Sequence, residues 1–564
     1  MPQKKIPLVK QIAWHQNKLP DDYLDAYFYL ERDNWNDQDY YTSFYLHATS
    51  LLTGDTRSRL IGYVKILKAG QQKLQVQQIS DETFDVLPET FCSMPTSLDY
   101  YERLSQISSE YRDKLLLALR DGIIYPEIRE SFENEDGFHV SLMRGRTEND
   151  EIFTLAPLML SRQYSQLYDM KLGFSFQTPE MEAPIDFDFD SPTFGWGNDH
   201  LPNRIVALIG RNGSGKSTLL NRIARIAYAS PLNRNEPVLK TLGEIKPFGL
   251  GFIRIILLSY SAFDSFNTPG IFKEEKATIV EEMKNGLGRF VFCGIRDIVS
   301  ELESLLPQLP ADEAGRLRDE DILQDRSKYT RLKPIDVLGT EFIRNLETIR
   351  QTREQDLFKV SVSLLREEPS MHNLLGLDIL DRDEENNTSF FHSLSTGHKF
   401  VIHAITSIIA YSAPRSLLLF DEPETHLHPP ILASFMKAIR YILAKKNAFM
   451  IVATHSPVVL QETLHRHVFV VRSEGKLMRI QKPEIETFGE SVGLLTQLSF
   501  GLNSDFTDYH NTLDKIVDFE TTFRLNSPEE ILSTIERLFE KGLSLQARTY
   551  VLSKIYNKGS DVES

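Results

Sequence analysis

The segment from Gly210 to Thr218, GRNGSGKST, gathers the residue types that bind a chain of phosphates. Its three glycines allow positive φ angles, which turn successive backbone N–H groups toward an anion. Lys216 adds positive charge for the phosphates, and the hydroxyl of Ser217 is a hard oxygen ligand of the kind that Mg²⁺ prefers. We expect a nucleotide site with Mg²⁺ formed by these residues: Gly210, Arg211, Asn212, Gly213, Ser214, Gly215, Lys216, Ser217 and Thr218.

A second chemical pattern is the segment LLLFDEP, from Leu417 to Pro423. Its apolar residues are typical of a fully buried parallel strand, and the carboxyl ends of such strands are where an open α/β sheet places its ligands. We expect Asp421 to reach Mg²⁺ through water and Glu422 to polarise the attacking water as general base. A solvated strand end is the alternative, and the phosphate loop upstream favours the nucleotide site.

Two further segments contribute polar groups. AFMIVATHSP, from Ala448 to Pro457, is an apolar strand pattern that ends at His455, which we expect to orient or sense the γ-phosphate. In LSTGHK, Ser395 and Gly397 lie where a helix should begin, which makes a second anion site from backbone N–H groups and a hydroxyl. A plain helix cap is an equally good interpretation of LSTGHK alone. His426 and His428, beside two prolines, are expected to form a structural turn rather than a metal site.

The elements that must position these groups have clear patterns around the phosphate loop. The run Ile205 to Ile209 has the apolar, β-branched composition of a buried strand, and the residues after the loop have helical periodicity as far as Ala224. FIRIILLSY, from Phe252 to Tyr260, is expected to be another buried strand. The region 271 to 380 is mostly charged and helical in pattern, which is more typical of a solvated lid than of a recognition surface.

Outside this head the patterns are less specific. Three segments between Asp25 and Lys68 alternate as antiparallel strands, and Ser97 to Asp121 predicts one amphipathic helix that ends at Gly122. FHVSLMRG and IFTLAPLML have strand-like or mixed patterns, and the acidic, proline-rich stretch EMEAPIDFDFDSPTFGWGNDHLP is expected to be a loop. We therefore expect an α/β protein with an N-terminal α+β module over 1–165, a head over 166–480 and a helical C-terminal region over 481–564.

The C-terminal region carries one strong local signal. Ser527 to Glu530 is a capping box, and the apolar residues that follow have helical spacing until Gly542 divides the pattern into two helices. The apolar face has two interpretations, packing on the protein's own core or docking of a partner. The apolar positions are Ile531, Leu532, Ile535, Leu538 and Phe539.

Composition limits the function. A net charge of −16 over 564 residues argues against general coating of nucleic acid, although a local basic patch and contact with DNA or RNA stay possible. Two cysteines in so long a chain indicate a reducing compartment. No apolar stretch approaches the roughly 18 residues of a membrane span. We expect a cytoplasmic protein that does not enter a membrane.

The order of GRNGSGKST, LSTGHK, LLLFDEP and ATHSP resembles that of the ATP-binding-cassette (ABC) ATPases. The segment ETHLHPP, after the acids, is similar to the soluble branch that includes SMC proteins, RecF and the OLD-family ATPases. The whole chain, with SLMRGRTEND and GESVGLLTQLSFGL, looks most like bacterial antiphage-defence ATPases such as the Septu ATPase. The resemblance implies a parallel sheet with an antiparallel β lobe and a helical lid.

The resemblance also implies roles and partners. Gly210 to Thr218 would bind ATP as the Walker A loop, with Asp421 linked to Mg²⁺, Glu422 as base and His455 as switch histidine. Ser395 and Gly397 would form the signature that meets the nucleotide of a second subunit. The resemblance also implies a head-to-tail dimer or a higher oligomer. It further implies a separate nuclease effector, which would be of HNH type if the chain is Septu-like. A RecF- or SMC-like DNA clamp and a self-contained OLD-type nuclease are the alternatives, and the tail beyond Arg472 lacks the Asp-x-Asp that the last one needs.

The sequence departs from the family pattern in two places. The second glycine of the signature is Thr396. The glutamine expected after the strand that ends near Tyr260 is missing. Ser259 at the end of that strand, and Ser261 or Asp264 in the continuation SAFDSFN, are the candidates in its place. Because that glutamine couples Mg²⁺ and the γ-phosphate to the lid in the family, we expect slow turnover.

Overall fold

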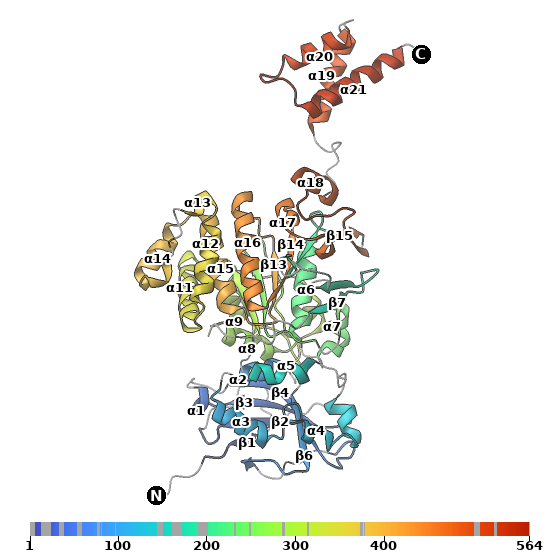
Figure 1. Cartoon of the computed structure of the whole chain (residues 1–564). Helices are drawn as coiled ribbons and strands as arrows, with labels where there is room; N and C mark the ends of the chain where they lie inside the picture. Colours follow the sequence, from blue (N-terminus) through green and yellow to red (C-terminus); the bar gives the residue numbers. More distant parts are fainter. Residues whose placement is uncertain are drawn as a thin grey trace. The chain divides into compact units, whose positions relative to one another are not determined.

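The computed structural model describes most of the chain and divides it into two compact units, Met1–Glu490 and Ser491–Ser564 (Figure 1). The described residues are 6–12, 24–32, 39–53, 59–75, 79, 82–95, 98–105, 107–143, 151–160, 172–189, 201–229, 233–247, 250–284, 288–312, 315–372, 376, 378–475, 477–500, 508–523 and 527–562. None of the helices among these residues is long and apolar enough to span a membrane.

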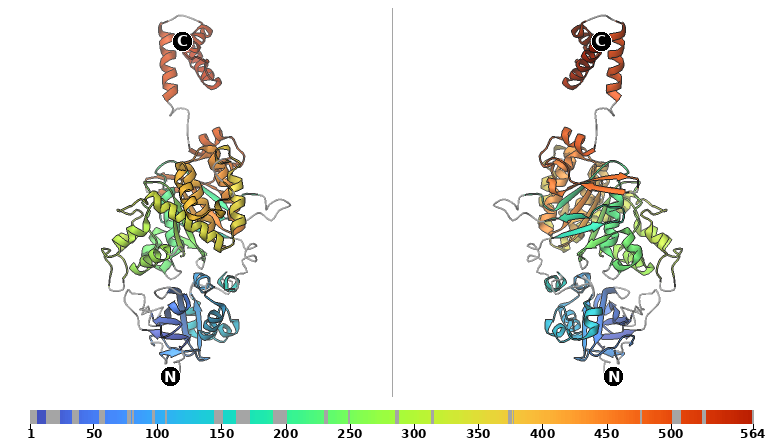
Figure 2. Two further views of the ribbon diagram at one scale, coloured as in Figure 1. Left: turned by 90° about the vertical axis from the view of Figure 1, so that its left-hand side faces the viewer. Right: turned by 90° about the vertical axis from the view of Figure 1, so that its right-hand side faces the viewer.

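A seven-stranded sheet forms the centre of the first unit, in the order β12-β11-β13-β14-β9-β15-β16. The first six of these strands run parallel and only β16 is antiparallel, so strands from both halves of the sequence lie side by side (Figure 2). The strands are β9 (Ile205–Ile209), β11 (Ile255–Ser259), β12 (Phe290–Gly294), β13 (Leu417–Asp421), β14 (Phe449–Thr454), β15 (Val468–Glu474) and β16 (Leu477–Gln481). This confirms the predicted α/β head and its buried apolar strands.

Helices cover the two faces of this sheet. Helix α6 (Lys216–Tyr228), directly after the phosphate loop, contacts β11, β13 and β14. On the other face, Phe420 of β13 packs against Phe400 of α15 (Thr396–Tyr411) and Phe435 of α16 (Pro429–Lys446). Figure 1 shows α15 and α16 on the opposite side of the strands from α6.

A small antiparallel sheet, β10-β7-β8, packs its apolar residues into the same core as α6. Its strands are β7 (Gly173–Gln177), β8 (Ile185–Asp188) and β10 (Glu244–Lys246). Strand β8 corrects the expectation that the whole acidic connection is a loop. The alternation in Ile185–Asp188 buries Ile185 and Phe187 and exposes the two acids, a half-buried strand pattern that the surrounding prolines and acids obscure. Residues 190 to 200 of that connection lie outside the described residues.

The region expected to be a helical lid also contains a strand. Its helices are α8 (Lys273–Lys284), α9 (Ile298–Leu305), α10 (Asp319–Leu323), α11 (Ile335–Gln351), α12 (Gln355–Leu365) and α13 (Pro369–His372), and α14 (Glu384–Ser393) follows. The sequence FVFCG between α8 and α9 is β12, the edge strand of the central sheet. Five apolar or small residues between charged helices are too few to distinguish a strand from a helix by periodicity.

The N-terminal residues form a six-stranded sheet in the order β5-β1-β2-β3-β4-β6 with their own core. Its strands are β1 (Val9–Ile12), β2 (Phe28–Arg32), β3 (Ser43–Ala48), β4 (Arg59–Lys68), β5 (Thr83–Phe84) and β6 (Phe91–Pro95). The three predicted strands are β2, β3 and β4, which pair antiparallel as expected. This sheet is joined to the head by an ion pair of 3.0 Å between Arg103 and Glu282 and by Ile253, which enters its core.

Two N-terminal predictions are wrong. The single helix expected over 97–121 is two helices, α2 (Leu98–Ser105) and α3 (Ser109–Ala118), and Ser108 has the extended backbone of a new N-cap between them. The segment FHVSL is one π-helical turn, and α5 (Glu151–Leu160) is a helix with Pro157 inside it. Helix α5 is apolar on all sides, so its sequence lacks the periodicity of an amphipathic helix and resembles that of a strand. Tertiary packing decides its structure.

The second unit contains α18 (Val492–Phe500), α19 (Asp508–Phe523), α20 (Pro528–Glu536) and α21 (Leu545–Val562). The capping box of Ser527 and Glu530 begins α20 as predicted. Ile531, Leu532 and Ile535 pack against α19 and α21 within this unit. Leu538 and Phe539 of the same predicted face remain 63% and 38% exposed.

Candidate functional site

The phosphate loop has the backbone shape that its glycines predicted. Gly215, with φ of 96°, caps the start of α6, and Gly210, with φ of 154°, lies so close to β15 that a Cβ atom would be 2.2 Å from the carbonyl oxygen of Val471. Only glycine fits both constraints. The loop therefore presents its N–H groups and the N-terminus of a 13-residue helix on one side, as anion binding requires.

Lys216 is buried at the first turn of α6, with 4% of its surface exposed. Its Nζ donates to the carbonyl oxygens of Gly210 at 3.0 Å and Arg211 at 3.3 Å. Burial lowers the pKa of Lys216, against the attraction of three nearby carboxylates. The ammonium group is thus held above the loop, where phosphate oxygens can replace the weaker carbonyl acceptors.

His455 lies next to this ammonium group at the end of β14. Its Nε2 is 2.7 Å from Lys216 Nζ, and because an ammonium only donates, Nε2 must be the acceptor of a neutral ring. Burial and the charge of Lys216 lower the pKa of His455 to about 4, which agrees with that assignment. The predicted strand-end histidine is therefore in contact with the predicted phosphate lysine.

Ser217 and Asp421 meet across the sheet. Ser217 Oγ donates to Asp421 Oδ1 at 2.9 Å, which joins the start of α6 to the last residue of β13. Burial raises the pKa of Asp421 to about 7, and the charges of Glu422 and Asp264 add to the rise. A hydroxyl and a buried carboxylate in contact are hard oxygen donors whose charge favours a cation, so these residues fit Mg²⁺.

Glu422 turns out of the strand with a φ of 48°, a backbone conformation that non-glycine residues rarely adopt. Its N–H still donates to the carbonyl oxygen of Ala453 at 2.9 Å, so the strained residue is fixed to β14. Glu422 Oε1 lies 3.7 Å from Nε2 of His455, and the Glu422 side chain is 37% exposed. This carboxylate is exposed enough to reach water, as a general base must.

Glu424 is a site residue that the motif reading missed. Both of its carboxylate oxygens accept from Thr454 Oγ1 at 2.9 Å, and one also accepts from the backbone N–H of His455. Glu424 thereby fixes the end of β14 and the position of His455. In the sequence, Glu424 is marked only as an acid two residues after Glu422, and its partner Thr454 lies 30 residues further along the chain.

Ser395 and Gly397 begin α15, as predicted, but they lie against a different part of the chain. Ser395 is an exposed N-cap whose Oγ accepts from the His398 N–H at 3.4 Å and lies 2.8 Å from His398 Nδ1. A Cβ atom on Gly397 would be 2.9 Å from the carbonyl oxygen of His426. Neither residue makes a hydrogen bond to Gly210–Thr218 in the described part of the chain. His426 Nε2 in turn lies 3.2 Å from the carbonyl oxygen of Tyr260, as a structural turn would.

The three candidates for the missing glutamine differ in what they face. Ser261 Oγ accepts from the Phe263 N–H at 3.2 Å, and Ser259 is a buried residue of β11. Asp264 is 6% exposed and lies close enough to Asp421 to raise the pKa of that residue. Of the three, Asp264 is the one that brings charge to the predicted metal position.

Arg296 is the charged neighbour of Asp264. Its Nη1 lies 3.8 Å from Asp264 Oδ1, while its Nε and Nη2 donate to the carboxylate of Glu301 at 2.6 to 3.1 Å. One guanidinium group therefore serves two buried carboxylates, which leaves negative charge uncompensated at Asp264. Nothing in the sequence around Arg296 indicated this role.

Comparison with known proteins gives three kinds of match. Residues 205–461 match a family model described as "AAA domain, putative AbiEii toxin, Type IV TA system". The protein ea59 of Escherichia phage lambda is 31% identical over 549 residues, covering 94% of this chain and 95% of that protein.

Solved structures match more weakly. An ATP-binding cassette of an ABC transporter, MJ1267, in its ADP conformation, is 14% identical, covers 58% of this chain and 95% of its own, and has a TM-score of 0.25. The SMC head domain from Thermotoga maritima is 15% identical, with coverage of 56% and 99% and the same TM-score of 0.25.

Proposed function

The chain belongs to the family of the phage lambda protein ea59, and we propose that it is an ATP-hydrolysing switch subunit that controls a separate nuclease in antiphage defence. The match of residues 205–461 to an AAA-domain model supports an ATPase head. The observation that carries the proposal is the convergence of Lys216, His455 and Glu422 on one side of a phosphate loop whose Ser217 contacts Asp421.

The geometry supports a division of labour for ATP hydrolysis. The N–H groups of the loop and Lys216 bind the phosphates, and Ser217 and Asp421 would hold Mg²⁺, with Asp264 behind them. The metal, when bound, supplies positive charge that neutralises the phosphate oxygens. Glu422 takes the proton of the attacking water, and neutral His455 donates its remaining N–H to a phosphate oxygen.

The lid favours a switch over an arm-bearing DNA clamp. Its longest described helix is α11, with 17 residues. At 1.5 Å per residue, such a helix is about 25 Å long, which is the size of a domain rather than of a coiled-coil arm. The helical lid and the C-terminal unit instead offer surfaces through which nucleotide state can reach another protein.

The C-terminal unit supports the proposal of a partner. Leu538 and Leu545 are 63% and 82% exposed, although seven described apolar side chains of α19, α20 and α21 are buried together in the core of the same unit. Large exposed apolar side chains on a small helical unit are typical of a protein-binding surface. We assign this surface to the effector and the signature helix α15 to a second copy of the chain.

A phage-infection assay tests the switch directly. Cells that carry the gene with its genomic neighbours should form plaques less readily than cells without them. Lys216→Ala should abolish that protection, because the variant still folds but lacks the positive charge that binds the phosphates of ATP. Lys240→Ala, at the exposed surface of α7 (Pro237–Leu242), is the matched control and should protect as the wild type does. Full protection by Lys216→Ala would contradict the proposal.

A further inference from the structure

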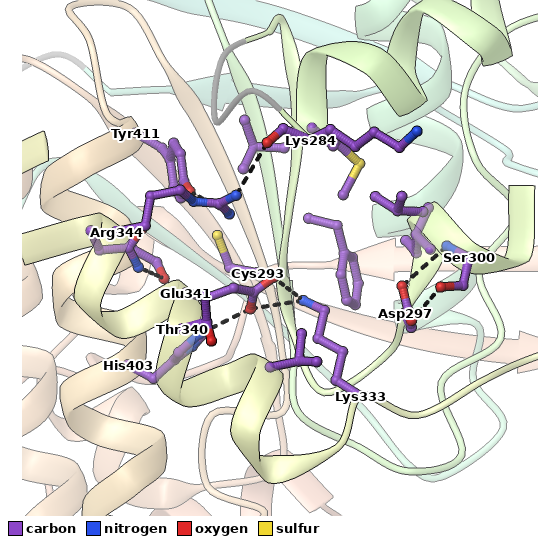
Figure 3. Close-up of a pocket in the computed structure, with 18 residues that line it drawn as sticks. Lys284, Cys293, Asp297, Ser300, Lys333, Thr340, Glu341, Arg344, His403 and Tyr411 are labelled. Atoms are coloured by element: carbon purple, nitrogen blue, oxygen red, sulfur yellow. Dashed lines mark hydrogen bonds and ion pairs between the residues drawn. The ribbon is translucent and has the colours of Figure 1, made fainter. Parts of the chain in front are cut away.

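A hollow of about 410 Å³ lies at the free edge of the central sheet, between β12, α9, α11 and α15 (Figure 3). It is separate from the nucleotide site, because none of the residues that line it belongs to the phosphate loop or to Asp421–Glu424. Its volume falls within the range of small-molecule sites, which is roughly 300 to 1,000 Å³.

The walls of the hollow are largely apolar. Side chains from four elements contribute: Met283 of α8, Val291 and Phe292 of β12, Ile298 of α9, and Val337 of α11. Such walls favour a ligand with an apolar body, because burying that body releases water from both surfaces.

The edge strand adds unpaired backbone groups. Ile255 N–H donates to the carbonyl oxygen of Arg289, so residues 289, 291 and 293 turn their backbone groups toward β11. The N–H and carbonyl of Phe292 therefore point away from β11, to the side on which Lys333 Nζ reaches the carbonyl oxygen of Gly294 at 3.0 Å. Within the described chain, the Phe292 backbone has no hydrogen-bond partner. A buried N–H and a buried carbonyl without partners favour a ligand that can both accept and donate a hydrogen bond.

The charges of the hollow are unequally paired. Lys333 is neutralised by Glu341 at 2.9 Å, and Asp297 accepts from the N–H and hydroxyl of Ser300. Arg344 donates only to two neutral oxygens, Lys284 O and Tyr411 Oη, both at 3.3 Å, and has no carboxylate within 4 Å among the described residues. Figure 3 shows its guanidinium group beside Tyr411 at one end of the hollow. An unpaired guanidinium is a site for a carboxylate or a phosphate.

From these features, we propose that the hollow binds a small molecule with an anionic group on an apolar body. The anionic group pairs with Arg344, the body lies against Val291 and Val337, and a polar edge of the body meets the Phe292 backbone.

The walls of the hollow reach the ATP site by two routes. His403 Nδ1 lies 2.8 Å from Tyr260 Oη, and the Tyr260 carbonyl oxygen is the partner of His426 in the segment after Glu422. On the other side, Arg296, which forms an ion pair of 3.8 Å with Asp264, is next to the lining residue Asp297. This regulatory part rests on the proposed ATPase function. A ligand in the hollow changes ATP affinity because it presses on the residues that position Asp264 and His426.

The test uses the full chain and the fluorescent anion 1-anilinonaphthalene-8-sulfonate as probe, titrated without nucleotide. One saturable site per chain is expected. Val337→Trp fills the hollow from its exposed rim and should abolish that site, and Arg344→Met should weaken binding about tenfold by removing a charged hydrogen-bond donor. Lys284→Met is the control. It removes the same charge from the rim, where Glu303 at 2.6 Å already pairs with it, and should bind the probe as the wild type does.

Wild-type binding by both Val337→Trp and Arg344→Met, with thermal unfolding unchanged, would place the probe elsewhere and overturn the site. Saturating probe should also shift the dissociation constant of ATP at least about threefold, and an unchanged constant would overturn the coupling. If the wild-type chain fails to bind ATP at all, the proposed function fails while the probe titration still decides the hollow.

Discussion

Asp264 is the residue at which the nucleotide site departs most from the ABC-ATPase pattern that the sequence resembles. Where the pattern has a neutral glutamine, this chain has a carboxylate that shares Arg296 with Glu301 and lies in the field of Asp421. Two buried carboxylates near one hydroxyl make the site depend on a cation more strongly than a glutamine would.

Asp264→Asn should therefore change the metal requirement. The amide keeps the acceptor for the Phe266 N–H, a bond of 2.9 Å, but removes the charge. We expect half-maximal ATP binding to need about tenfold more Mg²⁺, the usual size of the effect for a residue that supports a metal site. Fluorescent-ATP titration at fixed Mg²⁺ concentrations measures it, with Mn²⁺ binding by electron paramagnetic resonance as a second readout. Ser261→Ala is the control. A larger change in the Mg²⁺ requirement for Ser261→Ala than for Asp264→Asn would show that Asp264 does not support the metal site.

Sequence alone predicted the site residues that belong to local motifs. Lys216, Ser217, Asp421 and His455 are each marked by a strand end or a glycine-rich turn, and the structure brings them together. The supporting residues could not be predicted, because their partners are distant in sequence. Asp264 and Arg296 are 32 residues apart in number, and neither sits in a recognisable pattern.

At the level of elements, strands β9, β11, β13 and β14 of the head were predicted because burial on both faces makes them continuous apolar runs. Strands β8 and β12 were missed because each is short and flanked by charge or proline. In the N-terminal module, the break between α2 and α3 depends on Ser108 and on packing, neither of which interrupts the apolar period strongly. Hydrophobic periodicity thus predicted the elements that must be buried on both faces. It failed for elements whose type or ends depend on tertiary contacts.

Helix α15 gives the element-scale prediction. Gly397→Ala should push the start of this helix away from His426, because the new methyl group would be 2.9 Å from a backbone oxygen. We expect the rate of ATP hydrolysis to fall at least about fivefold while ATP binding stays intact, since α15 contacts the segment after Glu422 and not the phosphate loop. Gly339→Ala in α11, where the nearest atoms are 3.6 Å away, is the matched control and should leave the rate unchanged. Equal rates in both variants would remove the signature helix from the mechanism.

For the molecule as a whole, the division at Ser491 predicts that the two units have separable roles. The double variant Leu538→Ser with Leu545→Ser changes only exposed side chains and should lose co-purification of the effector while keeping ATP binding. Glu540→Ser, an exposed polar change in the same unit, is the control. Retained co-purification by the double variant would show that this surface is not the docking site.

Assembly is the second prediction at this scale. Among the described residues, the exposed Ser395 makes no hydrogen bond to the phosphate loop of its own subunit, whereas a head-to-tail pair would place it on the nucleotide of the other copy. Ser395→Arg and Lys216→Ala should each be inactive alone. Mixed in equal amounts, they should recover about a quarter of the wild-type ATPase rate, because half of the dimers are mixed and each holds one intact site. No recovery despite confirmed subunit exchange would leave Ser395 as an ordinary helix cap.

The most direct test of the central claim, that this site hydrolyses ATP with Glu422 as base, is a comparison of wild type and Glu422→Gln as purified full chains. ATP binding and the rate of phosphate release are measured on the same samples. We predict that the variant binds ATP with an affinity within about threefold of wild type and releases phosphate at least about a hundredfold more slowly, because only proton transfer is lost. Phosphate release by Glu422→Gln at the wild-type rate would contradict the account.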